Sequence, residues 1–120
     1  MKNKYIVPNW DGEVVRFYDT GTDFPGNENY DLNNINLTFQ LSNNKYNILH
    51  FMSHGNPTCW GIEHNSSYCT DNVVDLTNNN PFLVLTTACH TNAFDQAEPC
   101  LSEAFIRKQK GGAIAYFGGS

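Results

Sequence analysis

Three apolar blocks, each about the length of a β-strand, limit the folds that this sequence can adopt. They cover residues 46–53, 82–88 and 112–117, and mainly apolar residues occupy both faces of each block when the chain is extended. Strands of this kind are typical of a parallel sheet, because its crossover connections place helices over the sheet. The sequence therefore predicts an α/β fold with three layers and a mainly parallel sheet.

The segments around these blocks carry weaker signals of helices and strands. Residues 70–78 predict a short helix, and Pro99 predicts the start of a second helix at about residues 99–110. Residues 13–18 are typical of a short strand. Residues 31–44 fit a helix by one set of apolar positions and a strand by another, so their periodicity alone does not decide between the two.

Size and charge exclude several classes of protein. The chain has 120 residues, which fits one domain. No apolar run approaches the roughly 20 residues that cross a bilayer, and the first residues do not continue into the apolar part of an export signal. Seven Lys and Arg against twelve Asp and Glu give a net charge of -5, whereas nucleic-acid binding usually needs a basic surface. We therefore expect no membrane span and no nucleic-acid partner.

Reactive side chains follow two of the apolar blocks. The first block ends in His54 and Gly55, and the second ends in Cys89, 35 positions later (54 to 89). This distance allows one crossover between neighbouring parallel strands, whose carboxyl ends meet at one edge of the sheet. A thiol nucleophile needs a nearby imidazole, and a glycine amide can face a developing oxyanion. Spacing alone equally allows a buried, unreactive cysteine and a surface histidine.

Several short strings in order along the chain resemble gingipain-type cysteine peptidases. Residues 54–61 (HGNPTCWG) resemble the His-Gly loop of that family, and residues 73–78 (VVDLTN) resemble the helix between its catalytic strands. Residues 88–94 (ACHTNAF) are similar to its Ala-Cys nucleophile turn. Residues 99–105 and the strand at 113–117 continue the match.

The resemblance implies a caspase-like α/β sandwich, because this family shares a fold group with caspases, legumain and clostripain. It implies that residues 31–44 form a helix. It also implies hydrolysis of a polypeptide substrate by Cys89 as nucleophile and His54 as general acid/base, with the backbone amides of Gly55 and Cys89 as the oxyanion hole. No cofactor and no metal are expected, and the family suggests an extracellular or cell-surface location.

The match extends well over residues 37–120 and only weakly over residues 1–36. In the family, a carboxylate that orients the histidine would fall before residue 1, and pocket residues follow the strand that here ends at Phe117. We therefore expect residues 1–120 to be a single peptidase domain that is incomplete and holds the catalytic half. The sequence carries no prediction of the oligomeric state.

The sequence suggests roles for five further residues. Thr87, His90 and Trp60 are candidates for substrate binding. The alternatives are a strand residue with a core hydrogen bond for Thr87, a solvent-facing loop residue for His90, and packing beneath the His loop for Trp60. We expect His50 to be a hydrogen-bonded core histidine and Cys100 to be buried packing.

Two other functions compete with this interpretation, and one covalent link is a further possibility. A zinc-binding module would use Cys59, His64 and Cys69, with Cys89 and His90 offering a fourth ligand, but it lacks the close Cys pairs that zinc prefers. A catalytically inactive caspase-like interaction domain is the second. A Cys59–Cys69 disulfide in a secreted protein is compatible with peptidase function.

Overall fold

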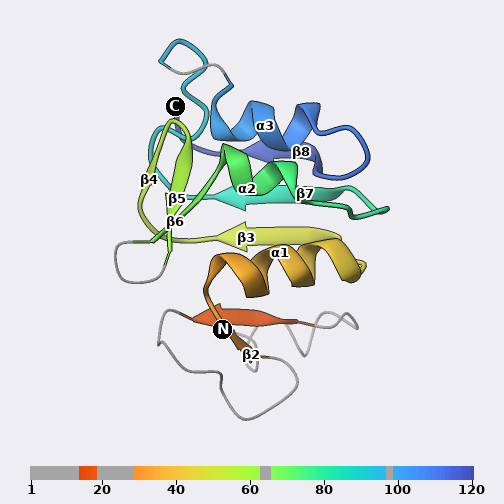
Figure 1. Ribbon diagram of the computed structural model, residues 1–120. Coiled ribbons are helices and arrows are strands. Elements are labelled where there is room, and N and C mark those ends of the chain that lie inside the picture. The colour runs from red at the N-terminus through yellow and green to blue at the C-terminus, as the bar shows by residue number, and fades with distance from the viewer. Residues whose placement is uncertain (1–13, 19–28, 63–65, 97–98) are drawn as a thin grey trace, which may run out of the picture.

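A parallel sheet forms the centre of the molecule in the computed structural model (Figure 1). The structure describes residues 14–18, 29–62, 66–96 and 99–120. The sheet has the strand order β3 (Ile48–Phe51), β7 (Phe82–Thr86) and β8 (Ala113–Phe117). Ile48 pairs with Leu83 in one parallel ladder, and β7 pairs in parallel with β8 with one irregularity after Phe82. The predicted α/β fold with a parallel sheet is confirmed.

Most of the segment 31–44 folds as a helix, α1 (Asn34–Asn43). Asn33 caps its start, because the Asn33 side-chain oxygen accepts a hydrogen bond from the Asn36 amide at 2.8 Å. Leu37 and Leu41 lie one turn apart and are buried, whereas Phe39 between them is 60% exposed. The capped start and the i, i+4 pair favour the helix over the alternating strand pattern of the same residues.

The other two helices are shorter than the sequence predicts. α2 spans Thr70–Val74, and the amide of Asp75 bonds back to the carbonyl of Asn72, which tightens and closes the last turn. α3 spans Leu101–Arg107, so it begins later and ends earlier than the predicted 99–110. Cys100 is its N-cap residue, since the Cys100 amide donates to a carboxylate oxygen of Glu103 at 3.0 Å.

After α3 three residues have positive φ angles, and this backbone conformation cannot continue a right-handed helix. Lys110, Gly111 and Gly112 have φ angles of 59°, 144° and 81°. The amide and the carbonyl of Gly112 both bond to the buried side chain of Asn78, at 2.8 Å and 2.9 Å. These bonds fix the approach to β8.

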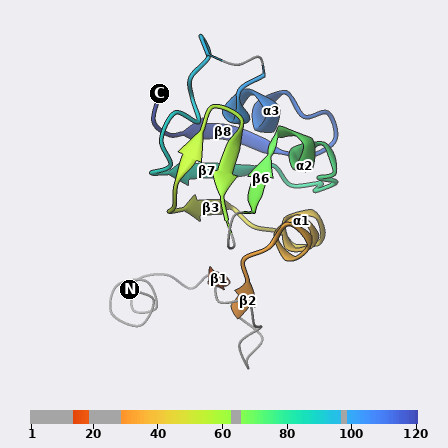
Figure 2. The same ribbon diagram turned by 60° about the vertical axis from the view of Figure 1, so that its left-hand side comes forward.

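Several short strands were absent from the sequence predictions. An antiparallel sheet is formed by β4 (Gly55–Asn56), β5 (Cys59–Gly61) and β6 (Ser67–Cys69). It stands across the carboxyl ends of β3 and β7 (Figures 1 and 2). β1 (Arg16–Tyr18) lies within the predicted strand 13–18 and pairs in parallel with β2 (Asn29–Asp31). Strands of two or three residues are too short to show a hydrophobic period.

One aromatic core joins the helices to one face of the parallel sheet. Buried side chains of α1, α2 and α3 pack with Phe51, Val84 and Tyr116 of the sheet. Trp60 of β5 is the centre of this core, with its ring 4.4 Å from Phe51 and 5.1 Å from Phe105 between centroids.

Among the described residues, no helix has the length and apolarity needed to cross a bilayer.

The second face of the parallel sheet is exposed. Ile48 is 45% exposed, Ile114 71% and Phe117 62%. The prediction of a buried His50 is wrong, because His50 alternates with Phe51 and so lies on this exposed face. The described ranges 14–18, 29–62, 66–96 and 99–120 thus supply two layers of the sandwich, the parallel sheet and the helices on its first face.

Candidate active site

Parallel pairing of β3 and β7 brings His54 and Cys89 to the same edge of the sheet. Phe51 is paired with Thr86, and His54 and Cys89 each lie three residues beyond this pair. The ladder continues past it, because the amide of Thr87 donates to the carbonyl of Phe51 at 3.2 Å. Both His54 and Cys89 are exposed, and the Cys89 thiol is free.

Gly55 lies in direct contact with the turn that carries Cys89. A Cβ atom placed on Gly55 would meet the Ala88 Cβ at 2.8 Å, the Cys89 carbonyl oxygen at 2.9 Å and the Thr91 methyl at 2.9 Å. Only a residue without a side chain allows this approach. The backbone that follows His54 therefore packs against the backbone that holds the Cys89 thiol.

A sharp turn presents Cys89. His90 has a φ of 57°, which is uncommon for a residue with a side chain, and the Ala93 amide bonds back to the His90 carbonyl at 3.1 Å. Asn92 fastens the turn to the end of the chain: its amide donates to the Gly119 carbonyl at 2.9 Å and its side chain to the Gly118 carbonyl at 3.0 Å. Backbone conformations of this kind often occur where a side chain has to be presented for function.

Two backbone amides beside Cys89 are available to a ligand. The Gly61 amide donates to the His54 carbonyl at 2.8 Å, so Gly55 and Trp60 form the adjacent pair that exchanges no hydrogen bonds. The Gly55 amide consequently points away from β5. Within the described part of the chain, the Cys89 amide has no hydrogen-bond partner either. Free amides at such a site can bind a negatively charged oxygen.

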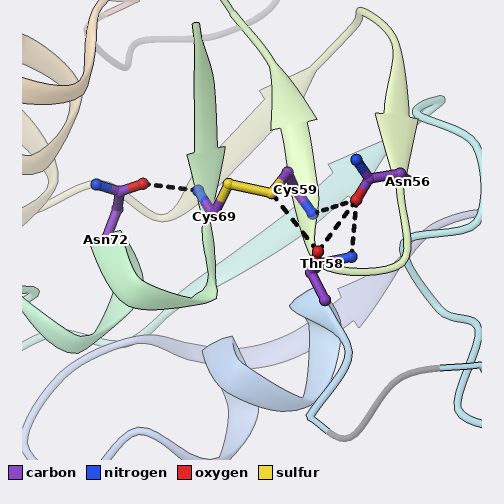
Figure 3. The surroundings of a disulfide bond; sticks show 5 residues. All are labelled: Asn56, Thr58, Cys59, Cys69 and Asn72. Atoms are coloured by element: carbon purple, nitrogen blue, oxygen red, sulfur yellow. Dashed lines mark hydrogen bonds between the residues drawn. A yellow bond between two sulfur atoms is a disulfide. The ribbon is translucent and has the colours of Figure 1, made fainter.

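The hairpin that carries Gly55 is fixed by side-chain bonds and by a disulfide (Figure 3). The side-chain oxygen of Asn56 accepts hydrogen bonds from the amides of Thr58 and Cys59, at 3.0 Å and 2.9 Å. Cys59 and Cys69 face each other on β5 and β6 and form a disulfide. The sequence left this disulfide as one open possibility, and the structure contains it. Since its sulfurs are oxidised, these two residues do not offer thiolate ligands to zinc.

The remaining candidates divide into exposed and buried residues. Thr87 and His90 are exposed beside Cys89. Trp60 is fully buried beneath the hairpin, which favours the alternative of packing over contact with a substrate. Cys100 is buried, as predicted. His64 lies outside the described residues, and within those that are described no group of three or more potential metal ligands occurs.

Sequence reasoning did not find Thr91, Asn92 or Tyr116. Thr91 is fully buried and contacts the site of Gly55, and Asn92 fastens the Cys89 turn. Asn is a common turn residue, so it gave no specific signal. Tyr116 belongs to a predicted strand, and its hydroxyl contacts became visible only in three dimensions.

Comparisons with known proteins identify the family. The sequence model of Peptidase family C25 matches residues 6–120. A solved structure described as "Structure of Protease" is similar with a TM-score of 0.60 and 30% sequence identity. That similarity covers 67% of this chain and 17% of the protease chain, so this chain spans a small part of that protein. No curated protein matches the sequence. The family match covers most of the chain, and the chain therefore belongs to Peptidase family C25, the gingipain family of cysteine peptidases.

Proposed function

We propose that this chain carries the catalytic dyad of a cysteine endopeptidase, with Cys89 as the nucleophile and His54 as the general acid/base. The observation that carries the proposal is the contact of Gly55 with Ala88, Cys89 and Thr91. This contact holds the residue after His54 against the backbone of Cys89. Both reactive side chains are exposed at that contact, where a peptide could reach them.

The chemistry follows from the two side chains. The Cys89 thiolate attacks the carbonyl carbon of the scissile peptide bond, and the carbonyl electron pair moves to oxygen. When the tetrahedral species collapses, protonated His54 gives its proton to the leaving amine, and a thioester to Cys89 remains. His54 then takes a proton from water, which attacks the thioester. The acid is released, and the thiolate and protonated His54 are restored.

The two free amides have a role in each half of the reaction. A negative charge develops on the carbonyl oxygen whenever the carbon becomes tetrahedral. The amides of Gly55 and Cys89 are available to donate hydrogen bonds to that oxygen. Donors already oriented for the transition state usually contribute more to rate than any other single feature of an acyl-transfer site.

The location of the protein is part of this proposal. A Cys59–Cys69 disulfide persists in oxidising surroundings and is rare in the cytosol. It supports an extracellular or cell-surface peptidase acting on polypeptides. The alternative function, an inactive caspase-like interaction domain, would retain the fold without turnover.

Selective alkylation tests the nucleophile. Limiting iodoacetamide near neutral pH should label Cys89 ahead of Cys100, because Cys89 is exposed and Cys100 is buried. Cys89→Ala should abolish peptide hydrolysis and leave the thermal unfolding midpoint nearly unchanged. Preferential labelling of Cys100, or activity in Cys89→Ala, would contradict the assignment.

Three matched histidine variants test the general acid/base. His54→Ala should lower kcat by at least about two orders of magnitude, the scale of lost acid–base catalysis. His50→Ala removes an exposed imidazole from the open face of the parallel sheet and is the control for His54, whereas His90→Ala tests the other imidazole beside Cys89. An active His54→Ala combined with an inactive His90→Ala would show that the wrong imidazole was chosen. Folded wild-type protein without thiol-dependent hydrolysis would favour the inactive interaction domain.

A further inference from the structure

A line of buried polar side chains runs from the hairpin to the peptide bond that precedes Cys89. The indole N–H of Trp60 donates to the hydroxyl of Tyr116 at 3.1 Å. The Thr91 side chain lies beside Tyr116, since the Tyr116 ring and the Thr91 hydroxyl oxygen both border the Cβ position of Gly118. The Thr91 hydroxyl donates to the carbonyl oxygen of Ala88 at 3.4 Å. The line thus joins β5, β8 and the Cys89 turn.

Every member of this line is shielded from water. Trp60, Thr91 and Ala88 have no exposed surface, and Tyr116 is 9% exposed. Desolvation by burial raises the pKa of Tyr116 to about 12, so its hydroxyl keeps its proton in the range in which peptidases work. Buried hydrogen bonds that polarise one another are stronger than the same bonds in water.

Thr91 is held in place from a second direction. Its carbonyl accepts a hydrogen bond from the Ser102 amide at 3.1 Å, in the first turn of α3. Gly118 closes over it, since a Cβ on Gly118 would meet the Thr91 hydroxyl oxygen at 3.0 Å and the Tyr116 ring at 2.8 Å. The Thr91 hydroxyl therefore has little freedom to turn away from Ala88.

The Ala88 carbonyl belongs to the same planar peptide unit as the Cys89 amide. A hydrogen bond to that oxygen fixes the plane of the unit and so the direction of the N–H on its other side. It also draws electron density toward oxygen, which makes this N–H a better donor.

We propose that Thr91, supported by Tyr116 and Trp60, is a positioning residue that aims the Cys89 amide at the oxyanion. This inference rests on the proposed function, because it assumes that Cys89 is the nucleophile. Thr91 touches neither thiol nor substrate in this role. It acts through the peptide unit that it holds.

Kinetics of three variants in active preparations of the protein test the proposal. Thr91→Val keeps the shape of the side chain and removes the hydroxyl. It should lower kcat by about 10- to 100-fold, somewhat less than the loss of a whole oxyanion donor, with little change in KM. Thr91→Ser restores the hydroxyl and should recover most of kcat. Tyr116→Phe should lower kcat by a smaller factor, because it removes only the support of Thr91.

Two measurements distinguish a misdirected Cys89 amide from a general loss of folded structure. Alkylation of Cys89 by iodoacetamide forms no oxyanion, so its rate should stay within about 2-fold of wild type in Thr91→Val. Tyr68→Phe is the matched control: Tyr68 is also fully buried in the aromatic core, but its hydroxyl contacts Thr38 and Asn72 instead. It should leave kcat unchanged.

Each contrary result overturns the inference in a recognisable way. An unchanged kcat in Thr91→Val, a parallel fall in alkylation rate, or an equal loss in Tyr68→Phe and Tyr116→Phe would each refute it. If Thr91→Val does not fold, an unchanged kcat in Tyr116→Phe refutes it instead. Failure of the proposed function looks different, because hydrolysis by Cys89→Ala would then persist whatever residue 91 is.

Discussion

Replacing Gly55 by alanine tests whether the contact between the His54 loop and the Cys89 turn is required for activity. The added Cβ would lie 2.8 Å from the Ala88 Cβ and 2.9 Å from the Cys89 carbonyl oxygen. Carbon atoms in contact lie about 3.5–4.0 Å apart, so the two segments must separate by roughly 0.7 Å. Neither neighbour is the movable end of a flexible side chain, so the backbone itself has to shift.

The displacement has a cost in stability and a larger one in rate. Overpacking of this kind costs about 1–3 kcal/mol of the free energy of unfolding. A misplacement near 1 Å of catalytic groups lowers the rate about 100-fold. Gly55→Ala should therefore remain folded and lose roughly two orders of magnitude in kcat/KM, measured by peptide hydrolysis alongside thermal unfolding.

Gly119→Ala is the control for this change. A Cβ on Gly119 would meet the Ala88 carbonyl oxygen at 3.6 Å and the Cys89 Cα at 4.0 Å, which are ordinary contacts beside the same turn. We expect its kcat/KM to stay within about 3-fold of wild type. Gly55→Ala with full activity would refute the claim that this contact sets the geometry of the site.

Three further predictions concern stability. Reduction of the Cys59–Cys69 disulfide, which closes a separation of 10 residues, should cost about 2–3 kcal/mol in urea unfolding, and a double Cys→Ser variant should match the reduced protein. Asn78→Ala should lower the free energy of unfolding by about 2–4 kcal/mol, because it removes the buried bonds that fix the start of β8. Burial raises the pKa of Tyr68 and Tyr116 to about 12, above the ordinary tyrosine value of 10.0, so the folded state favours the neutral phenols. This stabilisation is complete below pH 10 and should disappear between about pH 10 and 12, which unfolding of wild type and of the two Tyr→Phe variants across that range would measure.

The sequence predicted the long apolar elements and missed the short ones. The blocks at 46–53, 82–88 and 112–117 each contain a strand of the parallel sheet, because apolar residues on both faces of a strand leave a continuous apolar run, even though the second face is exposed in this structure. The antiparallel sheet of β4, β5 and β6 left no such run. Its strands are two or three residues long, and turn bonds from Asn56 together with a disulfide hold them.

The environment of a single side chain depends on tertiary contacts, and the hydrophobic periodicity of the sequence does not reveal these contacts. His54 and Cys89 could be placed at one sheet edge from strand ends alone. His50 was predicted to be buried because it lies four residues deeper into the sheet than His54, but its face of the sheet is exposed. Trp60 was a substrate candidate because it follows the His-Gly loop. Its ring instead fills the core, where its N–H finds the Tyr116 hydroxyl.

The connectivity of the parallel sheet has a consequence for the order of folding. The hairpin that carries Gly55 pairs Asn56 with Cys59, three residues later, whereas Ile48 of β3 pairs with Leu83 of β7 only after the long segment between them has formed a loop. Local contacts form sooner than distant ones, so the hairpin can assemble before Cys89 arrives beside it. A partly folded chain, whose backbone a protease could still cut, thus lacks a joined thiol and imidazole. By this topology the proposed thiol and imidazole come together only after β3 and β7 have paired.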